Sequence, residues 1–195
     1  MKSKVKFFLF GALSMLVTLV LVGFLFFQYA ENRRSEAVEK YLNTKVNTVE
    51  ISLLQLKTEK LQNLNLQPIS KNNKKFDFTN NRWVFLNLWA TWCKPCIAEM
   101  PELEELIQNP KIQNLSIEFA FASNEKIEKI KGFLNSRNFD LPFYHYNRAN
   151  LPKTLNYKSI PVTYLIDNQT GMVFKIEGMQ NWNNQFFIDF LISLN

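Results

Sequence analysis

The sequence predicts an α/β fold in which a central mixed sheet is flanked by helices. Residues 83–89 form a continuous apolar and aromatic run, broken only by one Asn, which is typical of a strand buried on both faces. Residues 115–122 predict a second strand, and residues 125–138 carry apolar side chains at helical spacing. Residues 162–166 and 172–176 flank an Asp-Asn-Gln-Thr-Gly turn, the pattern of an antiparallel hairpin. Strand–helix–strand order implies parallel pairing and the hairpin antiparallel pairing, so we expect a mixed sheet.

The composition suits one domain of ordinary size with an appendage. The chain has 195 residues, of which 47% are hydrophobic, and its 18 Phe residues favour a well-packed core over disorder. The net charge of +6 is mild, and no long basic stripe interleaved with aromatic residues is present. The charge pattern therefore argues against a nucleic-acid partner.

The N-terminal segment predicts a membrane anchor. Residues 7–27 carry no charged side chain and are long enough to cross a hydrocarbon core of about 30 Å as a helix. A cleaved signal peptide is the alternative, but its apolar region spans only about 7–15 residues. The nearest candidate cleavage point, after Ala30, also has Gln28 where a small residue is wanted. The segment is therefore interpreted as an uncleaved signal anchor.

Basic residues near the ends of this span predict its orientation. Lys2, Lys4 and Lys6 precede it, whereas Arg33 and Arg34 follow it among acidic residues that count little in this rule. We expect a single-pass protein of the cytoplasmic membrane, with its N-terminus in the cytoplasm and its domain in the periplasm or outside the cell.

The expected domain organisation has three parts. Residues 1–30 form the cytoplasmic tip and the transmembrane anchor. Residues 31–65 form a polar stalk and a lead-in segment, and residues 66–195 form the α/β domain. Within that domain, residues 141–146 predict a further short strand and residues 182–194 an amphipathic helix that closes the chain.

The two cysteines of the chain form a single C-x-x-C, Cys93 to Cys96. A structural disulfide framework would need more cysteines at wider spacing. A zinc site would need four ligands, and the chain offers only this pair and His145. The pair therefore predicts redox chemistry, with two buried, unreactive structural thiols as the alternative.

The position of the C-x-x-C predicts which thiol is reactive. Cys93 follows a buried strand and stands near the start of a predicted helix, with Pro95 in the first turn, where a missing N–H is harmless. The positive end of the helix dipole and the Lys94 cation favour a thiolate at Cys93. We expect Cys93 to attack and the shielded Cys96 to resolve. Lys94 and Pro95 tune the redox poise but do not by themselves fix it.

The run F-L-N-L-W-A-T-W-C-K-P-C-x-x-E-M-P resembles the thioredoxin-like proteins of the TlpA/ResA type, which are membrane-anchored bacterial thiol–disulfide oxidoreductases. The resemblance spans residues 66–195 and is most specific around W-C-x-P-C. It implies a thioredoxin-like fold and a cis peptide bond at Ile160-Pro161, facing the C-x-x-C. Such a bond would leave the backbone of Ile160 free to pair with a substrate strand. Trp92, next to Cys93, is expected to help dock the substrate and shield the disulfide.

Glu99 is the acid expected near the thiols. It lies three residues after Cys96, so it shares that side of the helix, although it could equally be a solvated acid that complements the dipole. The resemblance implies that a glutamate here tunes thiol protonation. Thioredoxin itself has a buried aspartate where this chain has the neutral Asn87, which leaves Glu99 as the nearby acid.

These observations predict a protein-disulfide reductase that needs no cofactor beyond the redox-active disulfide Cys93–Cys96. Its partners would be client proteins with disulfides. The resemblance implies a membrane thiol-reducing electron donor and, among the clients, apocytochrome c during cytochrome c maturation. A thiol oxidase or isomerase remains an alternative, as does a membrane-anchored binding module with redox-idle cysteines.

Overall fold

The structure is a computed structural model that describes residues 15, 18–30, 33, 51–55, 64–69, 75–78 and 81–194. The chain divides into two compact units, comprising essentially Met1–Thr44 and Lys45–Ser193.

In the N-terminal unit, residues 18–30 are helical, and the apolar side chains of residues 18–29 are exposed. The apolar run of residues 7–27 falls partly outside the described residues. Among the residues that the structure does describe, no helix combines the length and the apolar character needed for a membrane span.

The described residues of the second unit form a seven-stranded sheet in the order β1-β7-β6-β3-β4-β5-β2. The strands are β1 Ile51–Gln55, β2 Gln67–Pro68, β3 Trp83–Leu88, β4 Ile117–Ser123, β5 Phe143–His145, β6 Val162–Asp167 and β7 Met172–Glu177. The helices are α2 Lys94–Gln108, α3 Pro110–Gln113, α4 Ile127–Asn135 and α5 Gln185–Ser193, with 3-10 helices η2 Arg148–Asn150 and η3 Lys153–Leu155.

Strand β3 is central, and all six of its residues are buried. It pairs in parallel with β4 and antiparallel with β6, so the sheet is mixed, and β6 and β7 form the predicted antiparallel hairpin. The sheet extends beyond the boundary expected at residue 66, because β1, from the expected lead-in segment, pairs antiparallel with β7.

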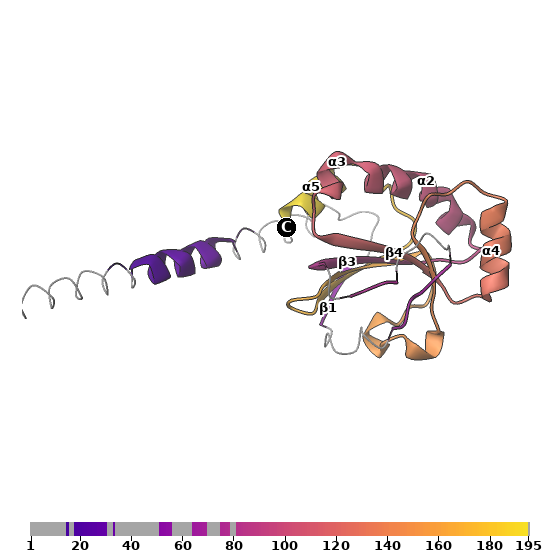
Figure 1. The fold of residues 1–195 in the computed structure, drawn as a ribbon, viewed down its shortest axis with the longest axis horizontal. Coiled ribbons are helices and arrows are strands. Elements are labelled where there is room, and N and C mark those ends of the chain that lie inside the picture. Colours follow the sequence, from indigo (N-terminus) through magenta and orange to yellow (C-terminus); the bar gives the residue numbers. More distant parts are fainter. Residues whose placement is uncertain are drawn as a thin grey trace, which may run out of the picture. The chain divides into compact units, whose positions relative to one another are not determined.

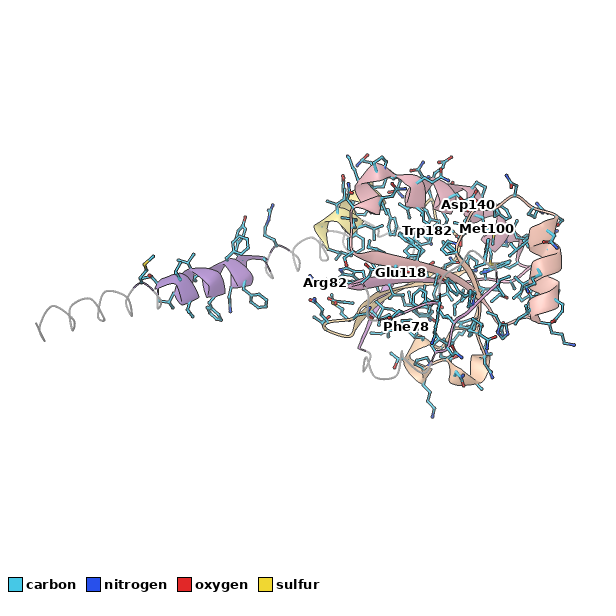
Figure 2. The ribbon with its side chains drawn as sticks, in the orientation of Figure 1. Phe78, Arg82, Met100, Glu118, Asp140 and Trp182 are labelled. Atoms are coloured by element: carbon cyan, nitrogen blue, oxygen red, sulfur yellow. A yellow bond between two sulfur atoms is a disulfide. The ribbon has the colours of Figure 1, made fainter. Side chains whose placement is uncertain are left out.

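Helices α2, α3 and α5 lie over one face of the sheet, and η2 and η3 lie over the other (Figure 1). Aromatic side chains fill the first interface, where Trp182 packs edge-on against Phe85 and Phe187 at centroid distances of 5.2 and 4.9 Å. Figure 2 shows Trp182 and Met100 in this layer. A second cluster, which includes Leu155 of η3, fills the opposite face. The sheet is therefore buried on both sides, as the apolar sequence of β3 predicts.

Two helices begin later than the hydrophobic spacing predicts. The final helix starts at Gln185 rather than residue 182, because the side-chain oxygen of Asn184 accepts a hydrogen bond from the backbone N–H of Phe187 at 2.8 Å and caps the helix. Helix α4 starts at Ile127, so Glu125 precedes it. As a result, Trp182 lies outside α5 and contacts α2, and Glu125 lies outside α4 and contacts the turn that precedes α2.

Candidate active site

Cys93 and Cys96 form a disulfide at the N-terminus of α2. Strand β3 ends at Leu88, and a turn closed by a 3.0 Å hydrogen bond from the Cys93 N–H to the Ala90 carbonyl leads into the helix. Cys93 is the N-cap residue, as expected from its place before Pro95. The predicted pair is thus brought together at the end of the central strand.

The start of α2 supplies the electrostatic field expected for a reactive Cys93. Its Sγ accepts a hydrogen bond from the backbone N–H of Cys96 at 3.2 Å, so one unpaired donor of the helix terminus points at the sulfur. Fifteen residues of helix extend behind it, which places the positive end of the dipole at this sulfur. Lys94 and Pro95 are exposed, whereas Cys93 and Cys96 are buried.

The Ile160-Pro161 peptide bond is cis, as the resemblance implied. Leu88, the last residue of β3, pairs with Val162, the first residue of β6. Pro161 therefore lies at the same end of the strands as the turn that leads to Cys93. The Pro161 carbonyl accepts a hydrogen bond from the Gly178 N–H at 2.9 Å, so the segment after β7 also lies at this end of the sheet.

Exposed apolar side chains lie in the segments at this end of the sheet. Trp92 is 66% exposed, and Met179, next to Gly178, is 57% exposed. Ile160 is half-buried against the core cluster under η3.

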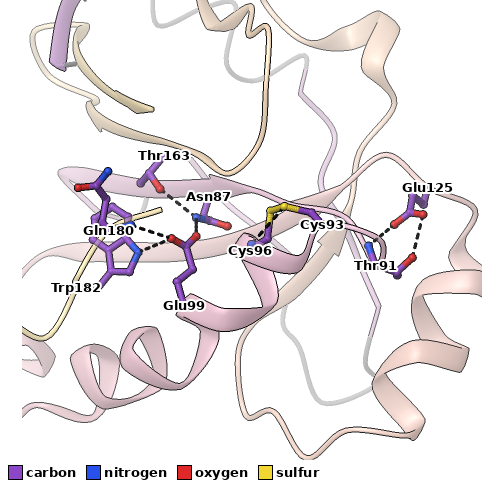
Figure 3. Close-up of a disulfide and its surroundings, with 9 residues drawn as sticks. All are labelled: Asn87, Thr91, Cys93, Cys96, Glu99, Glu125, Thr163, Gln180 and Trp182. Carbon is purple, nitrogen blue, oxygen red and sulfur yellow. Dashed lines mark hydrogen bonds between the residues drawn. A yellow bond between two sulfur atoms is a disulfide. The ribbon is translucent and has the colours of Figure 1, made fainter. Parts of the chain in front are cut away.

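Glu99 is not a solvated acid, because only 2% of it is exposed. Its Oε1 accepts a hydrogen bond from the Asn87 side-chain amide at 3.0 Å, and its Oε2 accepts one from the Trp182 indole N–H at 3.0 Å (Figure 3). The backbone N–H of Gln180 adds a longer bond to Oε2 at 3.4 Å. Burial raises the pKa of Glu99 to about 7, against the opposing effect of these three donors.

Asn87 joins this carboxyl to the sheet. Its amide nitrogen donates both to Glu99 and to the hydroxyl of Thr163, each at 3.0 Å, and all three residues are buried. Both N–H groups of the amide are therefore used. Thioredoxin has an aspartate at the position of Asn87. In this chain, the Asn87 amide instead donates a hydrogen bond that orients the Glu99 carboxyl of α2.

A second carboxylate, that of Glu125, holds the turn that carries Trp92. It accepts hydrogen bonds from the backbone N–H of Thr91 at 2.6 Å and from the Thr91 hydroxyl at 3.0 Å (Figure 3). Lys129, one helical turn further on, forms an ion pair with it at 2.5 Å. These bonds lower the pKa of Glu125 in spite of its partial burial.

The sequence predicts Cys93, Cys96, Glu99 and Pro161 as site residues, but not the contacts that the structure shows for a further set: Trp182, Gln180, Thr163 and Glu125. The sequence predicts only that Trp182 begins the last helix, whereas its hydrogen-bond partner Glu99 lies 83 positions earlier. The spacing of Glu99, Glu102 and Glu105 is a signal that could have indicated these contacts. It places three carboxylates on one side of a helix, where they can accept hydrogen bonds from another segment of the chain. In the described part of the chain, no group of three or more His, Cys, Asp or Glu side chains is placed to hold a metal ion.

A mixed sheet, a C-x-x-C disulfide at the helix after the central strand and a cis-proline at the start of the neighbouring strand define a thioredoxin-like domain. The sequence model of the AhpC/TSA family matches residues 43–175, more than half of the chain, and the chain belongs to this family. The solved structure of MTB dsbF, in its mixed oxidized and reduced forms, shares the fold with a TM-score of 0.51 at 14% identity, covering 72% of this chain and 99% of its own.

The curated relatives are thiol–disulfide oxidoreductases and thioredoxin-like proteins. The thiol-disulfide oxidoreductase ResA of Bacillus thuringiensis subsp. konkukian is 34% identical over 98 residues, which cover 50% of this chain and 56% of ResA. The thioredoxin-like protein YneN of Bacillus subtilis is 30% identical over 105 residues, 53% of this chain and 61% of YneN. The chain thus spans about half the length of the curated relatives it matches, and the resemblance to ResA is confirmed.

Proposed function

We propose that this chain is a thiol–disulfide oxidoreductase that reduces disulfides in client proteins. The observation that carries the proposal is the Cys93–Cys96 pair at the N-terminus of α2, with the buried Glu99 one helical turn further on. Its similarity to ResA proteins, named as thiol–disulfide oxidoreductases, supports the same activity.

In the first step, the reduced enzyme attacks through Cys93. The helix terminus and the Cys96 N–H stabilise the Cys93 thiolate, which attacks one sulfur of a client disulfide. The client S–S bond breaks, a mixed disulfide to Cys93 forms, and the other client sulfur leaves as a thiolate that takes a proton from water.

In the second step, Cys96 resolves the mixed disulfide. Its thiol gives a proton to the Glu99 carboxylate, and the resulting thiolate attacks the Cys93 sulfur. The bond to the client breaks, its second sulfur leaves as a thiolate, and the Cys93–Cys96 disulfide forms. The client gains two electrons and the enzyme loses two, so the enzyme must be re-reduced for another turnover.

The finer parts of the function extend this proposal to the cell. The uncharged run of residues 7–27 supports a signal anchor, with the domain in the periplasm or outside the cell. There a membrane thiol-reducing protein would return electrons to Cys93–Cys96, and apocytochrome c would be a client. A Cys96→Ala variant in native membranes should accumulate the client as a mixed disulfide, which mass spectrometry identifies. A c-type cytochrome precursor supports the pathway, whereas a panel of unrelated secreted proteins supports general reduction or isomerisation.

Two measurements on the purified full chain test the reaction and its direction. The reduced protein should reduce insulin disulfides, and the Cys93–Cys96 pair should titrate near the potential of thioredoxin, about −270 mV. A potential near that of the strong oxidants, about −120 mV, would contradict a reductase and favour an oxidase. Absence of insulin reduction together with slow alkylation of Cys93 at neutral pH would favour the redox-idle binding module.

A further inference from the structure

The chain segment between β7 and α5 is attached to the redox helix through a row of carboxyl groups. Trp182 donates its indole N–H to Glu99 at 3.0 Å and its backbone N–H to Glu102 at 2.9 Å. The side-chain amide of Asn183 donates to Glu105 at 2.6 Å. The three glutamates follow one another at intervals of three residues, so they lie along one side of α2.

Burial, ring contacts and two hydrogen bonds hold Trp182 in this arrangement. It is 2% exposed and wedged between the rings of Phe85 and Phe187, with centroid distances of 5.2 and 4.9 Å. Both of its N–H groups bond to α2. The indole is therefore a rigid donor whose direction is fixed by the packing around it.

The bond from Trp182 is the main constraint on one of the two Glu99 oxygens. Among the described residues, Oε2 otherwise receives only the 3.4 Å bond from Gln180, which is long for an N–H···O bond. Oε1 is held by Asn87 at 3.0 Å. Each oxygen of the Glu99 carboxyl thus has its own donor: Asn87 of the sheet bonds to Oε1, and Trp182 of the segment before α5 bonds to Oε2.

We propose that Trp182 is a positioning residue for the redox reaction, whose indole N–H holds the Glu99 carboxylate in the orientation that exchanges a proton with Cys96. This inference rests on the proposed reductase function and adds a residue that acts through Glu99. Figure 3 shows the bond from Trp182 to Glu99, with Glu99 on the same helix as Cys96.

The electrostatic surroundings give this bond a measurable role. The donors to Glu99 are neutral, namely Asn87 of β3 and Gln180 and Trp182 of the segment before α5. The neutral Thr163 of β6 bonds to Asn87 behind them. On α2 itself, Glu102 adds a like charge. Trp182 is the strongest of the donors that keep the pKa of Glu99 from rising further, so loss of its N–H should favour the protonated acid.

The test is the titration of the Glu99 carboxyl in the oxidised full chain, followed by ¹³C NMR, with Glu99→Gln identifying the resonance. Trp182→Phe keeps an aromatic ring and removes the N–H. We expect the midpoint to rise by about one pH unit, since a hydrogen bond to a charged group is lost. An unchanged midpoint overturns the inference. If the Phe variant does not fold, β-benzothienylalanine at position 182, which keeps the bicyclic ring but lacks the N–H, takes its place.

Trp89→Phe is the matched control. Trp89 is also buried, packs against Phe133 and Phe143, and its indole N–H has no hydrogen-bond partner among the described residues. It therefore reports the loss of indole volume without the loss of a bond, and should leave the Glu99 midpoint where it is. An equal rise in this control would attribute the effect to packing and overturn the inference.

A kinetic readout separates this inference from the proposed function. In single-turnover release of a client from its mixed disulfide with Cys93, the pH at which the rate rises should move upward in Trp182→Phe by the same amount as the NMR midpoint. A normal profile in a variant that still reduces insulin overturns the inference and leaves the function standing. No insulin reduction by the unmodified chain overturns the function, and with it the role assigned to Trp182.

Discussion

The indole N–H of Trp182 donates to a carboxylate oxygen of Glu99 over 3.0 Å, although 83 residues separate the two in sequence. Because Asn87 donates to the other oxygen, the acid is fixed between the central strand and the segment that precedes α5. Glu99 and the Cys93–Cys96 disulfide thus lie close together in sequence at the N-terminal end of α2.

Replacement of Glu99 by Gln should slow the release of the client from the mixed disulfide. In the unmodified chain, the pKa of Glu99 is raised to about 7, so the release rate should increase as pH rises through that value and the carboxylate becomes able to accept the Cys96 proton. In Glu99→Gln the increase should appear only near the ordinary pKa of a thiol, about 8.5. At pH 7.5 we expect a rate about 10- to 100-fold lower in single-turnover assays.

Glu105→Gln is the control for that measurement. Glu105 lies on the same helix but is exposed, and its carboxylate bonds to Asn183 rather than to the network around Asn87. This variant should keep the rise near pH 7. A Glu99→Gln profile that coincides with that of Glu105→Gln would show that Glu99 takes no proton in the reaction.

Glu99 should also make the oxidised domain less stable as pH rises. Its pKa is raised from 4.5 to about 7 in the folded state, so between these values the folded state binds more protons than the unfolded state. The stabilising effect is present below pH 4.5 and lost as pH rises through about 7. From pH 5 to pH 8 this effect lowers the free energy of unfolding by about 2–3 kcal/mol.

Urea denaturation of the oxidised protein at the two pH values measures this loss. Glu99→Gln should remove most of the difference between pH 5 and pH 8, because the amide does not titrate and can still accept a hydrogen bond from Trp182. Equal pH dependence in the variant and the unmodified chain would place the loss at another group.

Trp92→Ala should weaken client binding while leaving the fold intact. The side chain is 66% exposed, so its removal should change the free energy of unfolding by less than about 0.5 kcal/mol. If Trp92 docks the client, KM for a protein disulfide should rise about 10-fold, as for an exposed aromatic anchor of an interface. The rate with a small symmetrical disulfide should stay the same, and an equal loss for both substrates would argue against a docking role.

Glu125→Ala should loosen the turn between β3 and Cys93. The Thr91 N–H and hydroxyl lose their shared acceptor, which should cost about 1–2 kcal/mol of unfolding free energy and speed hydrogen exchange of the Thr91 amide. Lys129→Ala removes only the exposed ion pair and should cost less than about 1 kcal/mol. Similar costs for both variants would mean that the ion pair, not the bonds to Thr91, holds the turn.

The central strand and the C-x-x-C helix could be predicted from the sequence because their signals are local. An apolar run marks β3, and the cysteine pair with Pro95 marks the start of α2. The Ile160-Pro161 bond is a different case, since the residues alone favour trans and only the resemblance implied the cis form that is observed.

The burial of Glu99 could not be predicted in the same way. Helical spacing shows which side of α2 the residue occupies, but not that Gln180 and Trp182, from beyond β7, cover that side. Propensity also places Trp182 within the last helix, whereas the cap at Asn184 leaves it outside. Strand β1 is a similar case, because its place at the sheet edge depends on pairing with the distant β7.

The most direct test of the account is the reaction of two single-cysteine variants with a disulfide-containing peptide at pH 7. Cys96→Ala should form a stable mixed disulfide through Cys93, whereas Cys93→Ala should react far more slowly, because only Cys93 stands at the N-cap, where the helix dipole favours a thiolate, and Cys96 lies within the helix. Mass spectrometry of both variants over time gives the rates. Equal reactivity of the two cysteines, or no adduct on Cys93, would contradict a helix-activated Cys93 as the attacking thiol.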